Sequence, residues 1–456
     1  MQKRMRLLGA LAVAAAAMVP AATAAPAPTA PPASGKTVVK PVAPGNSGQR
    51  ISPPALTVPE CPASLACDVA PAAYAQNSSD PGDYGNFDLA TRPSHGLGVD
   101  YVVIHDTESS YASTVAEFQN PFAYVSAHYV VRSSDGHVTQ MVPTSDVAWH
   151  AGNWYVNSHS VGIENEGLAT DPVYYTDALY SSLATLTRYV ADRYGVPLDR
   201  MHLIGHDQVP GPTAVYQAGM HWDPGPYFDW ARLMQLVGAP ITAAGDGTGR
   251  VVTIDPDYAT NRPVVTYCQS GSCSTLPSRP SNFVYLHTAP SADAPLVADA
   301  LLSGTSLEPA GVGTTQANDW GDKAVTGQSF AVAGRQGEWL AIWYGGQKAW
   351  LYDPASAPTV IAGAGTVITP KAGLASIAVY GRAYPSSVST ATLGYSIPAG
   401  QQYVASGTIG GDYYSATTYN APTTYSVVAS NSERWYEISF NHRVAYVRAD
   451  DVDVVG

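Results

Sequence analysis

The order of hydrophobic and polar positions between residues 100 and 205 predicts a β-sheet. Three short apolar runs are typical of strands buried on both faces: 100–105, 160–164 and 201–205. Two alternating stretches, 126–131 and 137–142, flank a Ser-Asp-Gly sequence and predict a β-hairpin. Buried strands next to a hairpin indicate one sheet that other elements cover.

Apolar residues recur with a helical period between two of these strands. Four of them share one face of a helix: Leu179, Leu183, Leu186 and Val190. The helix is expected to start near Thr176 and to stop at Gly195. The pattern predicts an α/β fold, a mixed β-sheet flanked by helices, in a domain that we place at residues 57–240.

The C-terminal part of the chain loses the helical period and repeats itself. The stretch 339–350 alternates in hydrophobicity and recurs at 435–446, an offset of 96 residues. Each copy is read as a strand, a two-residue turn and a second strand, with turns at Gly345-Gly346 and Asn441-His442. The repeat predicts two small all-β units that resemble bacterial SH3-like barrels.

These units complete the expected domain organisation. We place module 1 at residues 281–358 and module 2 at 372–456, with a connector over 241–280. The modules are rich in aromatic residues, which serve core packing first and are also candidates for ligand contact.

The chain opens with the pattern of a secretory signal. Three basic residues, at 3, 4 and 6, precede an apolar run over 7–19, and Ala-Thr-Ala at 22–24 fits a cleavage site. Residues 1–24 are therefore expected to be a signal peptide of a secreted protein, and the Pro- and Ala-rich residues 25–56 a linker. No later apolar stretch reaches about 18 residues, so no membrane span is expected in the mature chain.

Four cysteines occur as two close pairs, Cys61/Cys67 and Cys268/Cys273. An even number in an exported chain favours disulfides, and two short local loops are the favoured pairing. A four-cysteine zinc site is the alternative. It is disfavoured because five residues separate the cysteines of the first pair, more than zinc sites usually have.

Charge excludes one class of partner. Removal of the three basic residues of the signal segment takes the formal charge from −13 to −16. The chain has no lysine between Lys40 and Lys323. A strongly acidic chain without a basic patch is not expected to bind nucleic acid.

Candidate chemistry concentrates in the domain at 57–240, because nine of the eleven histidines lie between residues 95 and 221. His105 and His206 each end an apolar strand, and Asp223 precedes a proline, which holds its backbone extended. Two imidazoles and one carboxylate are the ligands of an open catalytic zinc site. The alternative for Asp223 is an Asx turn. His202 is four residues before His206 but on a strand, so we interpret it as structural.

Six ordered motifs carry a family resemblance: VVIHDTE, SAHYVVRSSDGHVTQMVP, VAWHAG, SVGIENEG, IGHDQVPG and DPGPYFDW. They resemble the zinc-dependent N-acetylmuramoyl-L-alanine amidases, the family related to peptidoglycan recognition proteins and phage amidase lysozymes. The resemblance covers residues 98–240. It implies a mixed sheet flanked by helices, a peptidoglycan substrate and one zinc ion held by His105, His206 and Asp223.

The resemblance also implies roles for further residues. The catalytic glutamate falls on Glu164, with Glu166 as the competitor. Many members have a lysine two residues before the last ligand, where this chain has His221. We expect His221 to stabilise the developing oxyanion, and we expect His150 to contact substrate.

The predicted function is that of a secreted peptidoglycan hydrolase. Zinc-activated water would cleave the amide between N-acetylmuramic acid and L-alanine of the stem peptide. The alternative is a non-catalytic peptidoglycan-binding protein on the same fold, which would typically lack a ligand or the glutamate. A zinc peptidase that cuts within the stem peptide would share the ligands and differ in product.

The histidine at position 221 predicts a pH-sensitive enzyme. A histidine titrates near neutral pH and a lysine does not, so activity should change more between about pH 6 and 8 than in lysine-bearing relatives. The measurement is the pH–rate profile of the wild-type protein and of His221→Gln. A flat profile that the substitution leaves unchanged would remove His221 from the mechanism.

Overall fold

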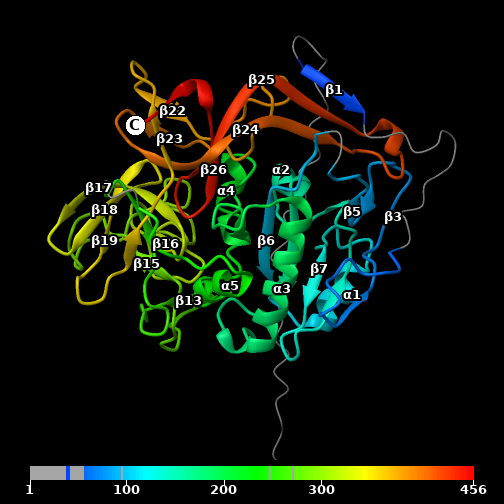
Figure 1. Cartoon of the computed structure of the whole chain (residues 1–456), viewed down its shortest axis with the longest axis horizontal. Helices are drawn as coiled ribbons and strands as arrows, with labels where there is room; N and C mark the ends of the chain where they lie inside the picture. The colour runs from blue at the N-terminus through cyan, green and yellow to red at the C-terminus, as the bar shows by residue number, and fades with distance from the viewer. Residues whose placement is uncertain (1–36, 42–55, 94–95, 246–247, 270–271, 456) are drawn as a thin grey trace, which may run out of the picture.

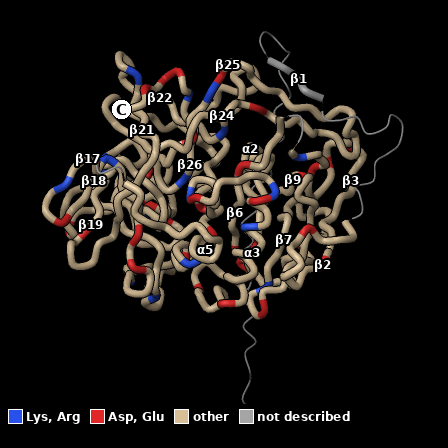
Figure 2. Tube along the Cα trace, viewed as in Figure 1, with Lys and Arg blue, Asp and Glu red and all other residues tan. Residues whose placement is uncertain are grey.

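The computed structural model describes residues 37–41, 56–93, 96–245, 248–269 and 272–455 (Figure 1). The predicted signal peptide lies outside these residues, as does most of the predicted linker. In the described part of the chain, no helix has the length and apolar character that crossing a bilayer requires. Lys and Arg residues are scattered among acidic residues over the part of the chain that the structure describes (Figure 2).

The expected mixed sheet is present and has six strands. In spatial order they are β11 (Leu203–Gly205), β6 (Tyr101–Asp106), β10 (Ser160–Asn165), β7 (Tyr129–Val131), β8 (Val138–Gln140) and β2 (Cys67–Val69). The first four run parallel, β7 and β8 form the predicted antiparallel hairpin, and β2 adds parallel to β8. Strands β6, β7 and β11 are buried along their whole length, which explains their short, mainly apolar sequences.

The register of the central strands sets the position of the site. Strands β6 and β10 pair so that Glu164 lies opposite His105. Both residues lie close to the carboxyl ends of their strands. Parallel strands present their carboxyl ends at one edge of the sheet, so residues distant in sequence meet there.

The long helix is also confirmed. Helix α3 spans Asp177–Tyr194; Thr176 accepts a hydrogen bond from the backbone of Leu179, and Gly195 ends the helix with φ 74°. Its apolar face is buried against the sheet and against α5. The other α-helices of the described residues are short: α1 (Tyr111–Phe118), α2 (Trp154–Ser158), α4 (Ala214–Gln217) and α5 (Trp230–Val237).

Both predicted disulfide pairings are present, Cys61–Cys67 and Cys268–Cys273. The first fastens the segment before β2 to the six-stranded sheet, because Cys67 is the first residue of β2. The second links neighbouring strands of a hairpin, β13 (Thr266–Gln269) and β14 (Ser272–Thr275).

Module 1 is all-β and draws strands from beyond its predicted bounds. Its five-stranded antiparallel sheet has the order β19 (Gln347–Tyr352), β18 (Trp339–Tyr344), β17 (Ser329–Gln336), β12 (Val251–Ile254) and β20 (Val360–Ala362). Strand β12 comes from the segment expected to be a connector. Gly345 and Gly346 form the predicted tight turn, and both have positive φ.

Module 2 is likewise all-β. Its antiparallel sheet contains β1 (Thr37–Pro41), β25 (Ser426–Ser439), β24 (Tyr403–Ser415), β21 (Thr366–Pro370), β27 (Val452–Val454) and β26 (Val444–Arg448). Strand β1 belongs to the segment predicted as a linker and pairs with the edge of β25. Two antiparallel strand pairs also belong to the modules: β15–β16 (Phe283–Tyr285 with Lys323–Val325) and β22–β23 (Ser376–Ala378 with Ser396–Pro398).

The turn predicted at Asn441-His442 differs from its counterpart in module 1. Ser439 pairs with Val444, so four residues, 440–443, join β25 to β26. A two-residue turn of this class needs positive φ at both positions, which suits the glycines of module 1. Instead, the side chain of Asn441 accepts a hydrogen bond from the backbone N–H of Arg443 at 2.9 Å. The prediction of a two-residue turn was therefore wrong here.

The modules pack directly on the domain at 57–240. The long hairpin of β24 and β25, orange in Figure 1, extends over that domain. Tyr414, Tyr425 and Val427 from this region join the same buried cluster as Phe87 and Val130. Module 1 contributes Phe283 and Val325 to the cluster under α3. The modules and the domain therefore share hydrophobic cores.

An ion pair within this interface predicts pH-dependent stability. His159 Nε2 lies 3.0 Å from Asp412 Oδ1, and both side chains are largely buried. Burial alone would lower the pKa of His159, but Asp412 raises it to about 9. The stabilisation is complete below pH 6.5, the ordinary histidine pKa, and is lost as pH rises through about 9.

We therefore expect the wild-type protein to lose up to about 3 kcal/mol of stability between pH 6.5 and 9 through this pair. The measurement is chemical unfolding across this range for the wild type and for Asp412→Asn. The difference between the two should shrink as pH rises, while the exposed Asp450→Asn should follow the wild type. A difference that stays constant with pH would contradict the assignment.

Candidate active site

Three buried side chains converge at the carboxyl edge of the six-stranded sheet. His105 is in β6, His206 follows β11 directly, and Asp223 lies in the loop between α4 and α5. Their potential ligand atoms all lie within 4.8 Å of one another. The structure thus brings together the three residues that the sequence singled out as metal ligands.

The geometry of this cluster fits a metal ion. His105 Nδ1 lies 3.3 Å from Asp223 Oδ2, and His206 Nδ1 lies 3.1 Å from Asp223 Oδ1. Metal bonds of roughly 2 Å to nitrogen and oxygen separate tetrahedral ligand atoms by roughly 3.3 Å. Nδ1 of His206 is buried without a hydrogen-bond partner among the described residues. Unpaired polar atoms at this spacing are what a bound cation would satisfy.

The electrostatics of the cluster favour the protonation states of ligands. Burial lowers the pKa of His206 to about 3, although Asp223 opposes the shift. Burial alone would raise the pKa of Asp223, but the neighbouring histidines hold it well below its usual value. A neutral imidazole and an ionised carboxylate are the forms that bind a metal.

Asp223 is positioned by its backbone as well as by its side chain. Its carbonyl accepts a hydrogen bond from the N–H of Asp207 at 2.7 Å, which ties its loop to the residue after His206. Its Oδ2 accepts from the N–H of Asp106 at 3.3 Å. These two hydrogen bonds restrain both the backbone and the carboxylate of Asp223, the residue that precedes Pro224.

Glu164 lies beside the cluster and Glu166 does not. Oε1 of Glu164 is 3.9 Å from His105 Nδ1, and its Oε2 is buried without a hydrogen-bond partner in the described part of the chain. Burial and the nearby Asp223 raise its pKa well above the ordinary value. Glu166 instead accepts hydrogen bonds from the N–H groups of Tyr111 and Ser133. The geometry therefore favours Glu164 as the proton-transfer group.

His150 lies behind His105. A hydrogen bond of 2.9 Å joins His150 Nδ1 to His105 Nε2, and a second of 3.0 Å joins His150 Nε2 to Ser160 Oγ. Only 6% of His150 is exposed. This arrangement fits orientation of a ligand through its second nitrogen better than the substrate contact that we predicted.

His221 lies at the rim of the cluster. Its Nδ1 is 3.6 Å from Asp223 Oδ1, and 62% of its side chain is exposed. A contact with Asp223 raises its pKa. An exposed imidazole next to the buried cluster can reach a bound ligand.

The sequence did not single out two further residues that hold the site. The Tyr175 hydroxyl lies 2.7 Å from Asp106 Oδ2 and 2.7 Å from the carbonyl of Pro224. It therefore ties the end of β6 to the loop of Asp223. Asp106 follows His105 in the VVIHD sequence, and this adjacency was the available indication of its position.

A mixed sheet that gathers two histidines, an aspartate and a buried glutamate at one edge has the arrangement of a hydrolase with a metal site. A comparison with family models agrees: residues 95–226 match the family Amidase_2, described as N-acetylmuramoyl-L-alanine amidase. The chain is 38% identical over 152 residues to N-acetylmuramoyl-L-alanine amidase A of Achromobacter lyticus, which covers 30% of this chain and 81% of that protein. The chain belongs to the N-acetylmuramoyl-L-alanine amidase family.

Other relatives match a smaller share of their length. The 1,6-anhydro-N-acetylmuramyl-L-alanine amidase AmpD of Escherichia coli K12 is 41% identical over 124 residues, which is 26% of this chain and 61% of that protein. Among solved structures, AmpDh3 from Pseudomonas aeruginosa has 25% identity and a TM-score of 0.28, over 35% of this chain and 67% of that one.

The packing of His150 generates a prediction about metal affinity. A Cβ added to Gly162 would lie 2.6 Å from the His150 ring. We expect Gly162→Ala to displace His150 from His105 and to weaken metal binding about 10-fold, as loss of an outer hydrogen-bond partner does. Calorimetric titration of the metal-free protein measures this. Gly410→Ala is the matched control, because an added Cβ meets no atom within 4 Å there; equal affinities would contradict the orienting role.

Proposed function

We propose that this protein is a secreted, zinc-dependent amidase that cleaves peptidoglycan between N-acetylmuramic acid and L-alanine of the stem peptide. One observation carries the proposal: the ligand cluster of His105, His206 and Asp223 lies beside Glu164, whose Oε2 is buried without a partner among the described residues. The family supports the bond that is cut, and the ligand set supports zinc as the ion.

The positions of the proposed ligands and of Glu164 suggest separate roles for the metal ion and for Glu164 in the reaction. When bound, zinc lowers the pKa of a water molecule and polarises the substrate carbonyl. Glu164, 3.9 Å from His105 Nδ1, is placed to accept the proton of the attacking water. Its raised pKa helps it to hold that proton and return it to the amine of L-alanine as the amide breaks.

His221 is proposed to act on the substrate oxygen. It replaces the lysine of many family members, and it is the exposed imidazole beside the buried cluster. A protonated imidazole there can donate a hydrogen bond to the oxygen on which charge develops. The neighbouring carboxylate of Asp223 favours this protonated form.

Secretion and the choice of polymer complete the proposal. The pattern of residues 1–24 and the two disulfides support an oxidising compartment outside the cytoplasm. The protein is acidic, with a formal charge of −13, so attraction to an anionic wall would require specific contacts rather than general electrostatics. A non-catalytic peptidoglycan-binding role is disfavoured, because the chain carries all three proposed ligands as well as Glu164.

Product analysis on purified peptidoglycan tests the proposal. The protein should release stem peptides with new L-alanine amino termini, lose this activity with a chelator and regain it with zinc. Asp223→Ala should be inactive because it removes a ligand. New amino termini on other residues would identify a peptidase, and wall binding without release under any metal would identify a binding protein.

A second variant separates proton transfer from metal binding. Glu164→Gln should keep zinc but lose at least about 100-fold in kcat, the usual contribution of a general base. The exposed Glu338→Gln in module 1 serves as the control and should retain activity. Full activity in Glu164→Gln would exclude Glu164 as the base.

A further inference from the structure

The four-residue turn of module 2 inserts against the loops that carry the metal ligands. This turn, residues 440–443, joins β25 to β26 and is buried throughout. It belongs to the last sheet of the chain, more than 200 residues after the ligands. Its contacts with those loops are polar and directional.

Arg443 makes the central contacts of this turn. Its guanidinium donates hydrogen bonds to the carbonyls of His206, at 3.4 Å, of Val209, and of His221, at 2.8 Å. The first two carbonyls belong to the loop after β11, and the third belongs to the loop that contains Asp223. The planar guanidinium of Arg443 therefore links the two loops that carry the proposed ligands.

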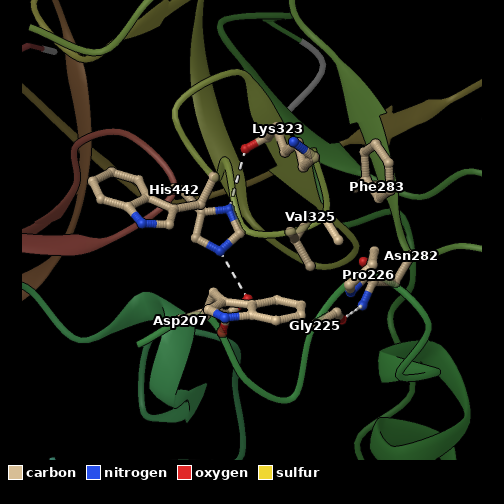
Figure 3. A pocket seen from close by; sticks show the side chains of 11 residues that line it. Asp207, Gly225, Pro226, Asn282, Phe283, Lys323, Val325 and His442 are labelled. Atoms are coloured by element: carbon tan, nitrogen blue, oxygen red, sulfur yellow. Dashed lines mark hydrogen bonds and ion pairs between the residues drawn. The ribbon is translucent and has the colours of Figure 1, made fainter. Parts of the chain in front are cut away.

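His442 adds a second contact to the first of these loops. Its Nε2 lies 2.8 Å from Asp207 Oδ2, and its Nδ1 lies 3.3 Å from the carbonyl of Lys323 in module 1 (Figure 3). Asp207 itself donates its N–H to the carbonyl of Asp223. The His442 imidazole thus contacts the side chain of Asp207, the residue whose backbone N–H links the two loops through a hydrogen bond.

The position of Arg443 is held by its own surroundings. The guanidinium stacks on the Trp320 ring of module 1, with 4.1 Å from Cζ to the ring centroid. The Arg443 residue is 1% exposed. A buried guanidinium is retained when carbonyls and an aromatic face replace its water, and its removal leaves those carbonyls without a donor.

We propose that Arg443 is a positioning residue of the amidase site: it sets the spacing of the two ligand-bearing loops, so that module 2 completes the catalytic centre. The proposal rests on the proposed function insofar as the loops hold a metal. It assigns module 2 a role in catalysis beyond any contact with the cell wall.

The direction in which zinc affinity changes on substitution of Arg443 distinguishes a positioning role from a purely electrostatic effect of its charge. Replacement of Arg443 by a neutral residue removes a positive charge near the cluster, and this alone would strengthen the binding of a cation. Loss of loop positioning weakens binding instead. A merely structural role would lower stability and leave zinc affinity and loop dynamics unchanged in the folded protein.

The experiment uses the full chain with three substitutions. Arg443→Gln removes the charge and the fork, Arg443→Lys keeps the charge but not the fork, and Arg448→Gln is the control. Arg448 lies five residues further along, in β26 of the same sheet, and stacks on Tyr380 and Trp435 rather than on the ligand loops. Zinc affinity is measured by calorimetry, and amide hydrogen exchange is measured by mass spectrometry on metal-free protein.

We expect zinc binding about 10-fold weaker in Arg443→Gln, an intermediate loss in Arg443→Lys and none in Arg448→Gln. Peptides that cover residues 206–209 and 221–223 should exchange faster in both Arg443 variants. Unchanged affinity and exchange in folded Arg443→Gln would overturn the proposal. If that variant fails to fold, the same readouts on Arg443→Lys decide.

The two proposals fail in different ways. Absence of zinc binding by the wild-type protein would overturn the zinc-dependent function. The exchange comparison on metal-free protein would then still decide whether Arg443 holds the two loops. Normal zinc binding by the wild type together with tighter binding by Arg443→Gln would reduce the role of Arg443 to its charge.

Discussion

The pairing of two parallel strands, β6 and β10, is the constraint on which the site depends. It sets Glu164 opposite His105, and the alternation of side chains puts Ser160 and Gly162 on the same face of β10 as Glu164. Ser160 and the small Gly162 then accommodate His150, which contacts His105 from behind. A shift of one residue would turn Glu164 to the opposite face of the sheet, so the burial of both strands protects the chemistry as well as the fold.

Local patterns carried much of this information in the sequence. Helix α3 begins after Thr176 and ends before Gly195 because a cap, an apolar period and a glycine agree over one continuous segment. The candidate ligands could be singled out because His105 and His206 end apolar runs and Asp223 precedes a proline, each within one of the motifs. Short stretches of sequence can specify such features, because the physical causes lie within a few residues of one another.

The remaining features depend on long-range contacts. The position of His150 behind His105 depends on the absence of a side chain at Gly162, which no pattern around His150 reveals. The turn at 440–443 resembles its repeat in sequence position, but lacks the glycines that close a two-residue turn. Arg443 contacts backbone carbonyls, and any sequence supplies carbonyls, so its role leaves no recognisable pattern. Such contacts become visible only when both parts are placed in space.

The hairpin arm of β24 and β25 has a consequence for how the enzyme samples its polymer. A catalytic unit on a flexible tether explores a volume around its anchor and reaches bonds at many distances. Here the arm and the shared cores fix the outer faces of both modules relative to the ligand cluster. If a module bound a polymer strand on its outer face, that strand would therefore be held at a fixed distance from the ligand cluster. In that case the positions of the cuts along the polymer would depend on the dimensions of the folded molecule.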